Sequence, residues 1–218
     1  KSLQELNLSE SGFNNMENLK DLSSLESLSL SKNNILNFSL LSQLTALTKL
    51  DLSETNFEDL SPISSLTKLV QLDVTACEVS DLSPLSSLEN LKKIAADETK
   101  LSTEDATLFV QNNPNILLIH HVKDLQSWWE SLSMAWKQAL VKINPSLEFD
   151  KPGIEILTQT LNLPSLDLDD SEIESLIPVI RFVALTSLSL SNNVLIDNLL
   201  PLQEVKTLQL VTAKNTSI

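Results

Sequence analysis

The sequence contains no tyrosine, two glycines and one cysteine, and aromatic residues make up only 4% of its 218 residues. Because 42% of the residues are hydrophobic, a core must be built mainly from aliphatic side chains. A single cysteine, Cys77, excludes an intrachain disulfide and a zinc site of several thiolates. With so few glycines the chain has neither a phosphate-binding glycine loop nor a Gly-x-Ser-x-Gly elbow. The sequence therefore predicts no catalytic residues, no metal site and no cofactor.

Basic residues are also scarce, since 15 Lys and Arg stand against 29 Asp and Glu and the formal net charge is -14. Nucleic-acid binding depends on clustered Lys and Arg, so we exclude nucleic acid and anionic membranes as partners. No apolar run reaches the roughly 18 residues of a transmembrane helix, which excludes membrane insertion. The chain starts at Lys1 inside a repeat, without Met, so we expect further sequence upstream in the native protein.

A leucine phrase recurs every 22 residues, beginning at Leu3, Leu25, Leu47, Leu69 and Leu91. In each copy, apolar residues follow three and five places after the first leucine, with polar or small residues between them. This alternation predicts a short strand with one buried face. A fixed period in this range predicts a solenoid whose coils bury their leucines against one another.

The other half of each repeat is regular too, and it predicts how the chain returns to the next strand. Residues 59–63 (Asp-Leu-Ser-Pro-Ile) match residues 81–85 (Asp-Leu-Ser-Pro-Leu), where proline favours a turn or a first helical turn. The eighth phrase position holds residues able to satisfy buried backbone groups at the turn after the strand. This structural ladder consists of Asn33, Thr55, Cys77, Thr99 and, in a later repeat, Asn193.

The pattern Leu-x-x-Leu-x-Leu-x-x-(Asn/Cys/Thr) resembles that of leucine-rich repeat proteins. The 22-residue copies with Asp-Leu-Ser-Pro-Leu are most similar to bacterial internalin-type and phosphatase-regulator-type repeats. The resemblance implies an α/β solenoid with short parallel strands on the concave face and turns, 3-10 or short helices on the convex face. It also implies a non-catalytic scaffold that binds a protein of unknown identity or a cell surface. The expected location is outside the cell or at its surface, with the cytoplasm as the alternative. At the eighth position it implies a structural role for the Cys77 thiol rather than a reactive one.

The first array is predicted to end near His121. Ser102 and the carboxylates after it predict a helix that runs to Gln111. Residues 113–118 fall 22 positions after the phrase at Leu91 and predict a sixth strand. Its outward positions hold Leu117 and Ile119, and exposed aliphatic residues on a terminal strand indicate that something covers them.

Helical periodicity replaces the repeat after this strand, with one apolar stripe from Lys123 to Ile143 and a second helix over residues 154–161. Trp129 and Trp136 lie on the stripe, and we expect them to cover the sixth strand. Trp128 lies off the stripe and is a candidate contact with a partner.

The leucine phrase resumes at Leu163 and Leu185, and a last, shortened copy begins at Val205. Fifty positions separate Asn113 from Leu163, so the second array is out of register with the first. We therefore predict an N-terminal array over residues 1–121, a helical cap or connector over 122–160 and a short C-terminal array over 161–218.

The third and fifth phrase positions should point outward from the concave face, which repeat proteins commonly use for binding. Without Trp, Tyr or Arg, such a face must rely on charge and hydrogen bonds. The candidate binding residues are Glu5, Ser27, Lys49, Asp51, Gln71, Asp73 and Lys93.

Self-assembly is the alternative function, with Leu117, Ile119 and Trp128 forming a secondary interface and the chain a weak homo-oligomer or the stalk of a larger surface protein. A last pair of residues, His120 and His121, should point to opposite faces of a strand and so could not share a metal ion.

Overall fold

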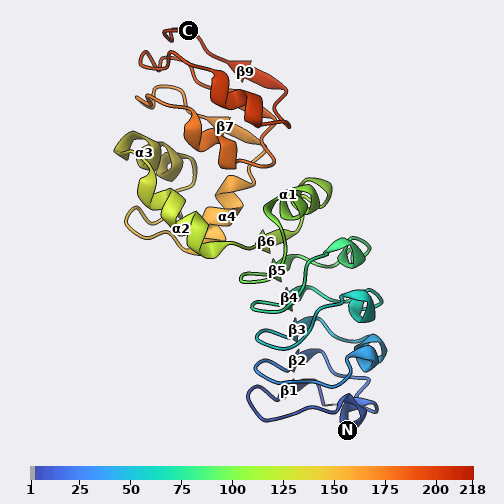
Figure 1. Ribbon diagram of the computed structural model, residues 1–218. Coiled ribbons are helices and arrows are strands. Elements are labelled where there is room, and N and C mark those ends of the chain that lie inside the picture. Colours follow the sequence, from blue (N-terminus) through green and yellow to red (C-terminus); the bar gives the residue numbers. More distant parts are fainter. Residues whose placement is uncertain (1–2) are drawn as a thin grey trace. The chain divides into compact units, whose positions relative to one another are not determined.

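The computed structural model describes residues 3–218, and the chain divides into two compact units, residues 1–121 and residues 122–218 (Figure 1). Each unit has its own parallel sheet, with six strands in the first and three in the second. Within residues 3–218, none of the helices has the length and apolar character needed to cross a membrane.

The first unit is a stack of coils, each contributing one three-residue strand to the sheet. Neighbouring strands are parallel and in phase, so that Leu28, Leu50 and Leu72 lie side by side and are buried. Each leucine therefore packs on its counterparts in the next coils, as the 22-residue period predicts. The strands are β1 (Glu5–Asn7), β2 (Ser27–Ser29), β3 (Lys49–Asp51), β4 (Gln71–Asp73), β5 (Lys93–Ala95) and β6 (Leu117–Ile119).

The sixth strand lies two residues later than the period predicts. Ile94 pairs with Leu118, 24 positions on, whereas the 22-residue period placed Ile116 beside it. The reason is the returning segment, where a ten-residue helix replaces the short 3-10 turn of the earlier coils. The longer element requires a longer coil.

The returning half of each coil is a 3-10 helix in the first four repeats and an α-helix in the fifth, as expected. Proline occupies the first turn of the third and fourth 3-10 helices. The α-helix begins after Ser102, whose hydroxyl accepts a hydrogen bond from the Asp105 amide. The elements are η1 (Met16–Leu19), η2 (Ser39–Gln43), η3 (Ser61–Ile63), η4 (Ser83–Leu85) and α1 (Thr103–Asn112).

The turn after each strand requires a left-handed residue, and these coils meet that requirement without glycine. The residue just before each ladder position has a φ between 54° and 58° in the second to fifth coils, a region that favours glycine. These positions are Lys32, Glu54, Ala76 and Glu98. The scarcity of glycine therefore means strain at every turn rather than an absence of tight turns.

The second unit begins with helices and ends with a short array. Its helices are α2 (Val122–Ser131), α3 (Met134–Ile143) and α4 (Ile154–Leu161), its strands β7 (Ser165–Asp167), β8 (Ser187–Ser189) and β9 (Leu210–Thr212), and its 3-10 helices η5 (Ile177–Arg181) and η6 (Leu200–Glu204). The apolar stripe from Lys123 to Ile143 thus spans two helices rather than one. The break falls before Ser133, whose hydroxyl caps α3 by accepting a hydrogen bond from the Trp136 amide.

The last repeat is not shortened. Leu188 of β8 pairs with Val211, 23 positions on, so the phrase begins at Leu208 and not at Val205. The Leu208 amide donates to the Val205 carbonyl, in the way that the Leu185 amide donates to the Phe182 carbonyl one repeat earlier. The regular spacing of leucines had suggested a frame three residues too early.

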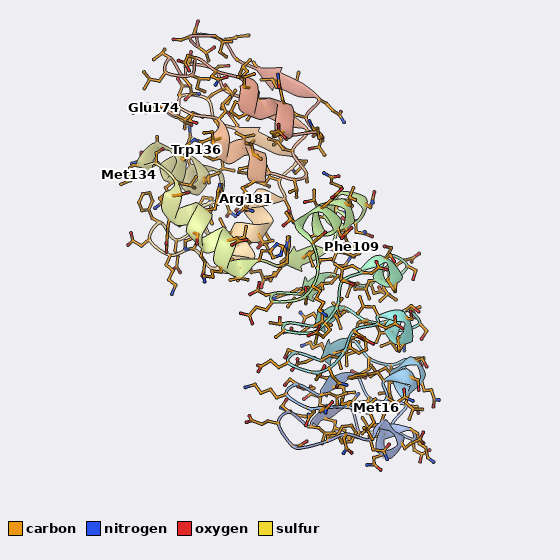
Figure 2. The ribbon with its side chains drawn as sticks, viewed as in Figure 1. Met16, Phe109, Met134, Trp136, Glu174 and Arg181 are labelled. Carbon is orange, nitrogen blue, oxygen red and sulfur yellow. The ribbon has the colours of Figure 1, made fainter. Side chains whose placement is uncertain are left out.

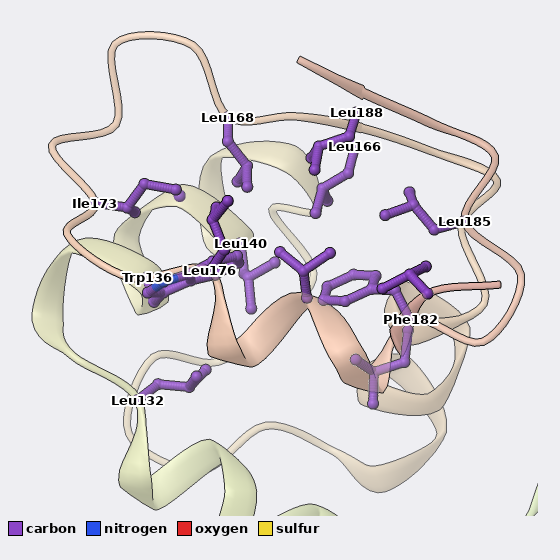
Figure 3. Packing of buried hydrophobic residues seen from close by; sticks show 14 of the residues in the cluster. Leu132, Trp136, Leu140, Leu166, Leu168, Ile173, Leu176, Phe182, Leu185 and Leu188 are labelled. Carbon is purple, nitrogen blue, oxygen red and sulfur yellow. The ribbon is translucent and has the colours of Figure 1, made fainter. Parts of the chain in front are cut away.

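One hydrophobic cluster joins the helices of the second unit to its repeats (Figure 3). Trp129 and Trp136 are each only 2% exposed and pack in this cluster with Leu140, Leu176 and Phe182. Both indoles are core residues, as expected, but the core is that of residues 122–218. We expected them to cover the sixth strand, but the cluster in which they pack consists of residues between Leu125 and Ala213.

Candidate functional site

The outward face of the six-stranded sheet is lined by two rows of side chains in register. Lys49, Gln71 and Lys93 occupy equivalent positions on β3, β4 and β5, and Asp51 and Asp73 form the next row. Above these strands lies a shallow hollow of about 300 Å³, lined by residues of β2, β3, β4 and β5. A row with two cations thus lies beside a row with two carboxylates.

Glu5, Lys49 and Gln71 are exposed to solvent, whereas Ser27 and Lys93 are half-buried. Long side chains on adjacent strands stand about 5 Å apart, so Lys49 and Gln71 can reach the same partner group. These two residues are the most accessible members of the predicted set on the central strands.

Asp51 is held inside a hydrogen-bond network. The Ser29 hydroxyl donates to Oδ2 at 2.6 Å, and the Ser53 hydroxyl and amide donate to Oδ1 at 2.6 and 3.0 Å. Burial alone would raise the pKa of Asp51, but these donors outweigh it and lower the pKa below the usual value. Asp51 is therefore ionised at neutral pH, and both of its oxygens already have donors.

Where a strand of the first sheet ends in Asp or Asn, that side chain also shapes the turn that follows. Asp73 accepts a hydrogen bond from the Thr75 amide at 2.9 Å, and Asn7 accepts one from the Ser9 amide at 2.8 Å. Asp and Asn commonly bond a backbone amide two residues on, so the recurrence of these residues at one phrase position was a signal for this role. Asp51 and Asp73 thus have a structural role in addition to the binding role predicted for them.

Asn33 and Asn193 each satisfy several backbone groups at a turn. The Asn33 amide group donates to the Leu8 and Leu30 carbonyls at 2.8 and 2.9 Å, and its oxygen accepts from the Phe13 amide at 3.0 Å. Asn193 donates in the same way to the carbonyls of its own and the preceding coil, both at 2.8 Å. A side chain at this position therefore links two coils.

Thr55, Cys77 and Thr99 have smaller ladder roles. The Thr55 hydroxyl donates to the Leu52 carbonyl at 2.6 Å, and the Cys77 thiol lies 3.0 Å from the same oxygen. The half-buried Thr99 donates to the Ala96 carbonyl at 2.9 Å. Burial raises the pKa of the Cys77 thiol, so the thiolate that would react is disfavoured.

The proposed secondary interface is less accessible than expected. Ile119 is only 7% exposed, and Leu117 and Trp128 are half-buried. The low exposure of Leu117 and Ile119 agrees with the cover expected for apolar residues on a terminal strand, and it leaves less apolar surface for the alternative role in self-assembly.

His120 and His121 are together rather than on opposite faces. Their Nδ1 atoms lie 3.0 Å apart, and the ring centroids are separated by 4.7 Å. His121 has a φ of 47°, so the chain has left the extended conformation on which the alternation argument depends. Among residues 3–218, no three His, Cys, Asp or Glu side chains are grouped so as to hold a metal ion.

Comparison with known proteins supports the interpretation of the 22-residue period as leucine-rich repeats. Residues 45–87 match the family model described as leucine rich repeats (2 copies). No curated protein sequence matches the chain.

Two solved structures from Listeria monocytogenes are similar to the chain over nearly all of its length. Internalin C2 shares 21% identity at a TM-score of 0.50, covering 96% of this chain and 80% of its own. An internalin (inlF) shares 18% identity at a TM-score of 0.50, covering 99% of this chain. This chain spans only 62% of that internalin. At such identities the likeness concerns the fold.

The in-phase parallel strands, the returning 3-10 helices and the family match lead to one conclusion. Residues 45–87 match leucine-rich repeats, and the chain has a leucine-rich repeat fold similar to that of the two internalins.

Proposed function

We propose that the outward face of β1–β6 binds a protein partner and that the chain is a non-catalytic scaffold. The observation that carries this proposal is the pair of in-register rows above the hollow, with Lys49 and Gln71 exposed beside ionised Asp51. Repetition places these groups at fixed spacing on a stiff sheet, which favours a partner with complementary charges.

Asp51 has a supporting role in this proposal. Because its oxygens are engaged by Ser29 and Ser53, it contributes a fixed negative charge rather than a free acceptor. Lys49, Gln71 and Lys93 would then make the direct contacts. A face without large aromatic anchors implies modest affinity and strong dependence on salt.

Site-specific photo-crosslinking tests whether this face meets a partner. A photoreactive amino acid at Gln71 should capture a protein that the same amino acid at Glu89, an exposed residue of the returning half, does not capture. Equal capture from both positions would place the contact elsewhere.

Charge reversal then tests the chemistry with the captured partner. The double change Lys49→Glu and Lys93→Glu should weaken binding roughly tenfold or more, because each removes an attraction and adds a repulsion. Lys20→Glu with Lys68→Glu is the matched control, since it changes the net charge equally away from the face. Unchanged affinity of the first variant would contradict the proposal.

We also propose that the protein works outside the cell or at its surface. The support is the likeness of its Asp-Leu-Ser-Pro-Leu repeats to the internalin type. Protease treatment of intact cells would remove the native protein if it is exposed, and its full protection would favour the cytoplasm.

A further inference from the structure

The second unit has a groove of about 490 Å³ between the segment joining α2 to α3 and the 3-10 helix η5. Its apolar lining comes from Trp128, Leu132, Trp136, Ile177, Pro178 and Ile180. Two of the chain's three tryptophans therefore contribute to a single surface feature.

Polar groups beside the indole rings are engaged within the chain. The Trp136 Nε1 donates to the Ser175 carbonyl at 2.8 Å, and the Ser131 hydroxyl donates to the Trp128 carbonyl at 2.7 Å. Ser133 is the cap of α3. The indole N–H of Trp136 and the Ser131 hydroxyl thus already have partners within the chain, and the floor of the groove offers mainly apolar surface.

Apolar side chains are unusually exposed along this groove. Ile177 is 65% exposed and Ile180 is 41% exposed. Trp128, by contrast, is half-buried, because its ring packs edge-to-face on Phe182 with centroids 6.3 Å apart. A fixed aromatic wall thus lies beside aliphatic side chains that lack cover in this unit.

Two residues of opposite charge, Glu174 and Arg181, line the groove together with Trp136, and all three are labelled in Figure 2. Within residues 3–218, Glu174 and Arg181 form no ion pair with each other. The Arg181 guanidinium donates to the Asp124 carbonyl at 3.4 Å, a bond that orients it without neutralising it. Both charges are available to a ligand.

We propose that this groove binds an extended peptide segment of a partner protein. The segment would insert one aliphatic or aromatic side chain between Trp128 and Ile177, place a carboxylate toward Arg181 and place a cation toward Glu174. Two opposite charges at different positions along an apolar groove favour one direction of the bound peptide. This site is separate from the outward face of the first array and does not depend on the function proposed for it.

A displayed library of random twelve-residue peptides, selected on the full chain, tests the proposal. We expect enriched peptides to carry one large apolar residue between an acidic and a basic residue. A synthetic copy of an enriched peptide should bind Ile177→Asp at least tenfold more weakly by fluorescence anisotropy. Because Ile177 is exposed, this variant should keep the wild-type thermal unfolding curve.

A charge-exchanged variant makes the test specific. The double change Glu174→Lys and Arg181→Glu should prefer a synthetic peptide whose acidic and basic residues have been exchanged. Lys137→Glu with Glu148→Lys is the control for charge exchange outside the groove, and it should leave the peptide preference unchanged.

Three results would overturn the proposal. Equal peptide binding by wild type and Ile177→Asp would show that the groove is not the site. Enriched peptides without the charge pattern would remove the role of Glu174 and Arg181. A concentration-dependent dimer in sedimentation that Ile177→Asp abolishes would make a second copy of the chain the occupant.

Discussion

The two units bury their leucines against different partners. The first unit stacks six strands and relies on aliphatic side chains, with Phe57 and Phe109 among its few buried aromatic residues. The second unit stacks only three strands, and its core also takes in three helices with Trp129 and Trp136. A short stack has few neighbouring coils to bury its leucines, so large side chains from another element supply the missing apolar contacts.

The largest expected effect comes from removing the side chain that joins the helices to the second array. Trp136→Ala should cost about 3–5 kcal/mol of unfolding free energy, because it leaves a cavity and removes the donor to the Ser175 carbonyl. Calorimetry should show this loss in the transition of residues 122–218 alone.

Met134→Ala is the control for that change, since Met134 lies in the first turn of the same helix and is 61% exposed. Its cost should stay within about 0.5 kcal/mol. A Trp136→Ala variant that shifts both transitions equally would show that the two units do not differ in the way described.

Removing a buried leucine from the first unit is the next largest change. Leu72→Ala removes a central inward side chain that is 2% exposed and should cost about 2–5 kcal/mol. Chemical denaturation measures it, with exposed Leu36→Ala as the control. A loss below about 0.5 kcal/mol would undermine the assigned register.

The ladder should matter equally in both units. Asn33→Leu orphans the turn groups that Asn33 satisfies and should cost about 1–3 kcal/mol. Asn193→Leu makes the same change in the second unit and should cost a similar amount. Urea unfolding measures the free energy lost by each variant. Equal losses would show that the Asn side chain has the same role in both units, and a loss in only one unit would contradict this.

The smallest expected effect is a gain in stability at a strained turn. Ala76→Gly should stabilise the chain by about 0.5–1 kcal/mol. Ala76 has a φ of 55°, where the alanine Cβ is crowded against the backbone and glycine is not. Asp170→Gly, at a φ of 54° in the second unit, is the control, since aspartate tolerates this region better. Destabilisation by Ala76→Gly in thermal melts would argue against turn strain.

Much of the fold could be predicted because each coil repeats a local rule. The period at Leu25, Leu47 and Leu69 placed the strands, and Ser102 placed the start of α1. The frame failed where the returning segment changed length, at β6 and β9. Leucine spacing alone could not reveal those changes, because several apolar residues lie near one another there.

The candidate site was predictable in position but not in detail. Register follows from the repeat, so Lys49, Gln71 and Lys93 could be placed in one row. The hydrogen bond from Ser29 to Asp51 joins residues 22 positions apart on neighbouring coils, and it depends on side-chain conformations that the repeat pattern does not specify.

The pattern of residues alone determined the strands, the ladder and the presence of helices. A strand places every second side chain on one face and a helix every third or fourth, so the spacing of apolar residues indicates which element forms. Tertiary structure alone decided that Ile119 is buried, that His120 and His121 meet and that Trp136 lies beside Glu174 and Arg181 in one groove. Those outcomes depend on how unlike elements pack, which is set by side-chain shape and turn conformation rather than by any period along the chain.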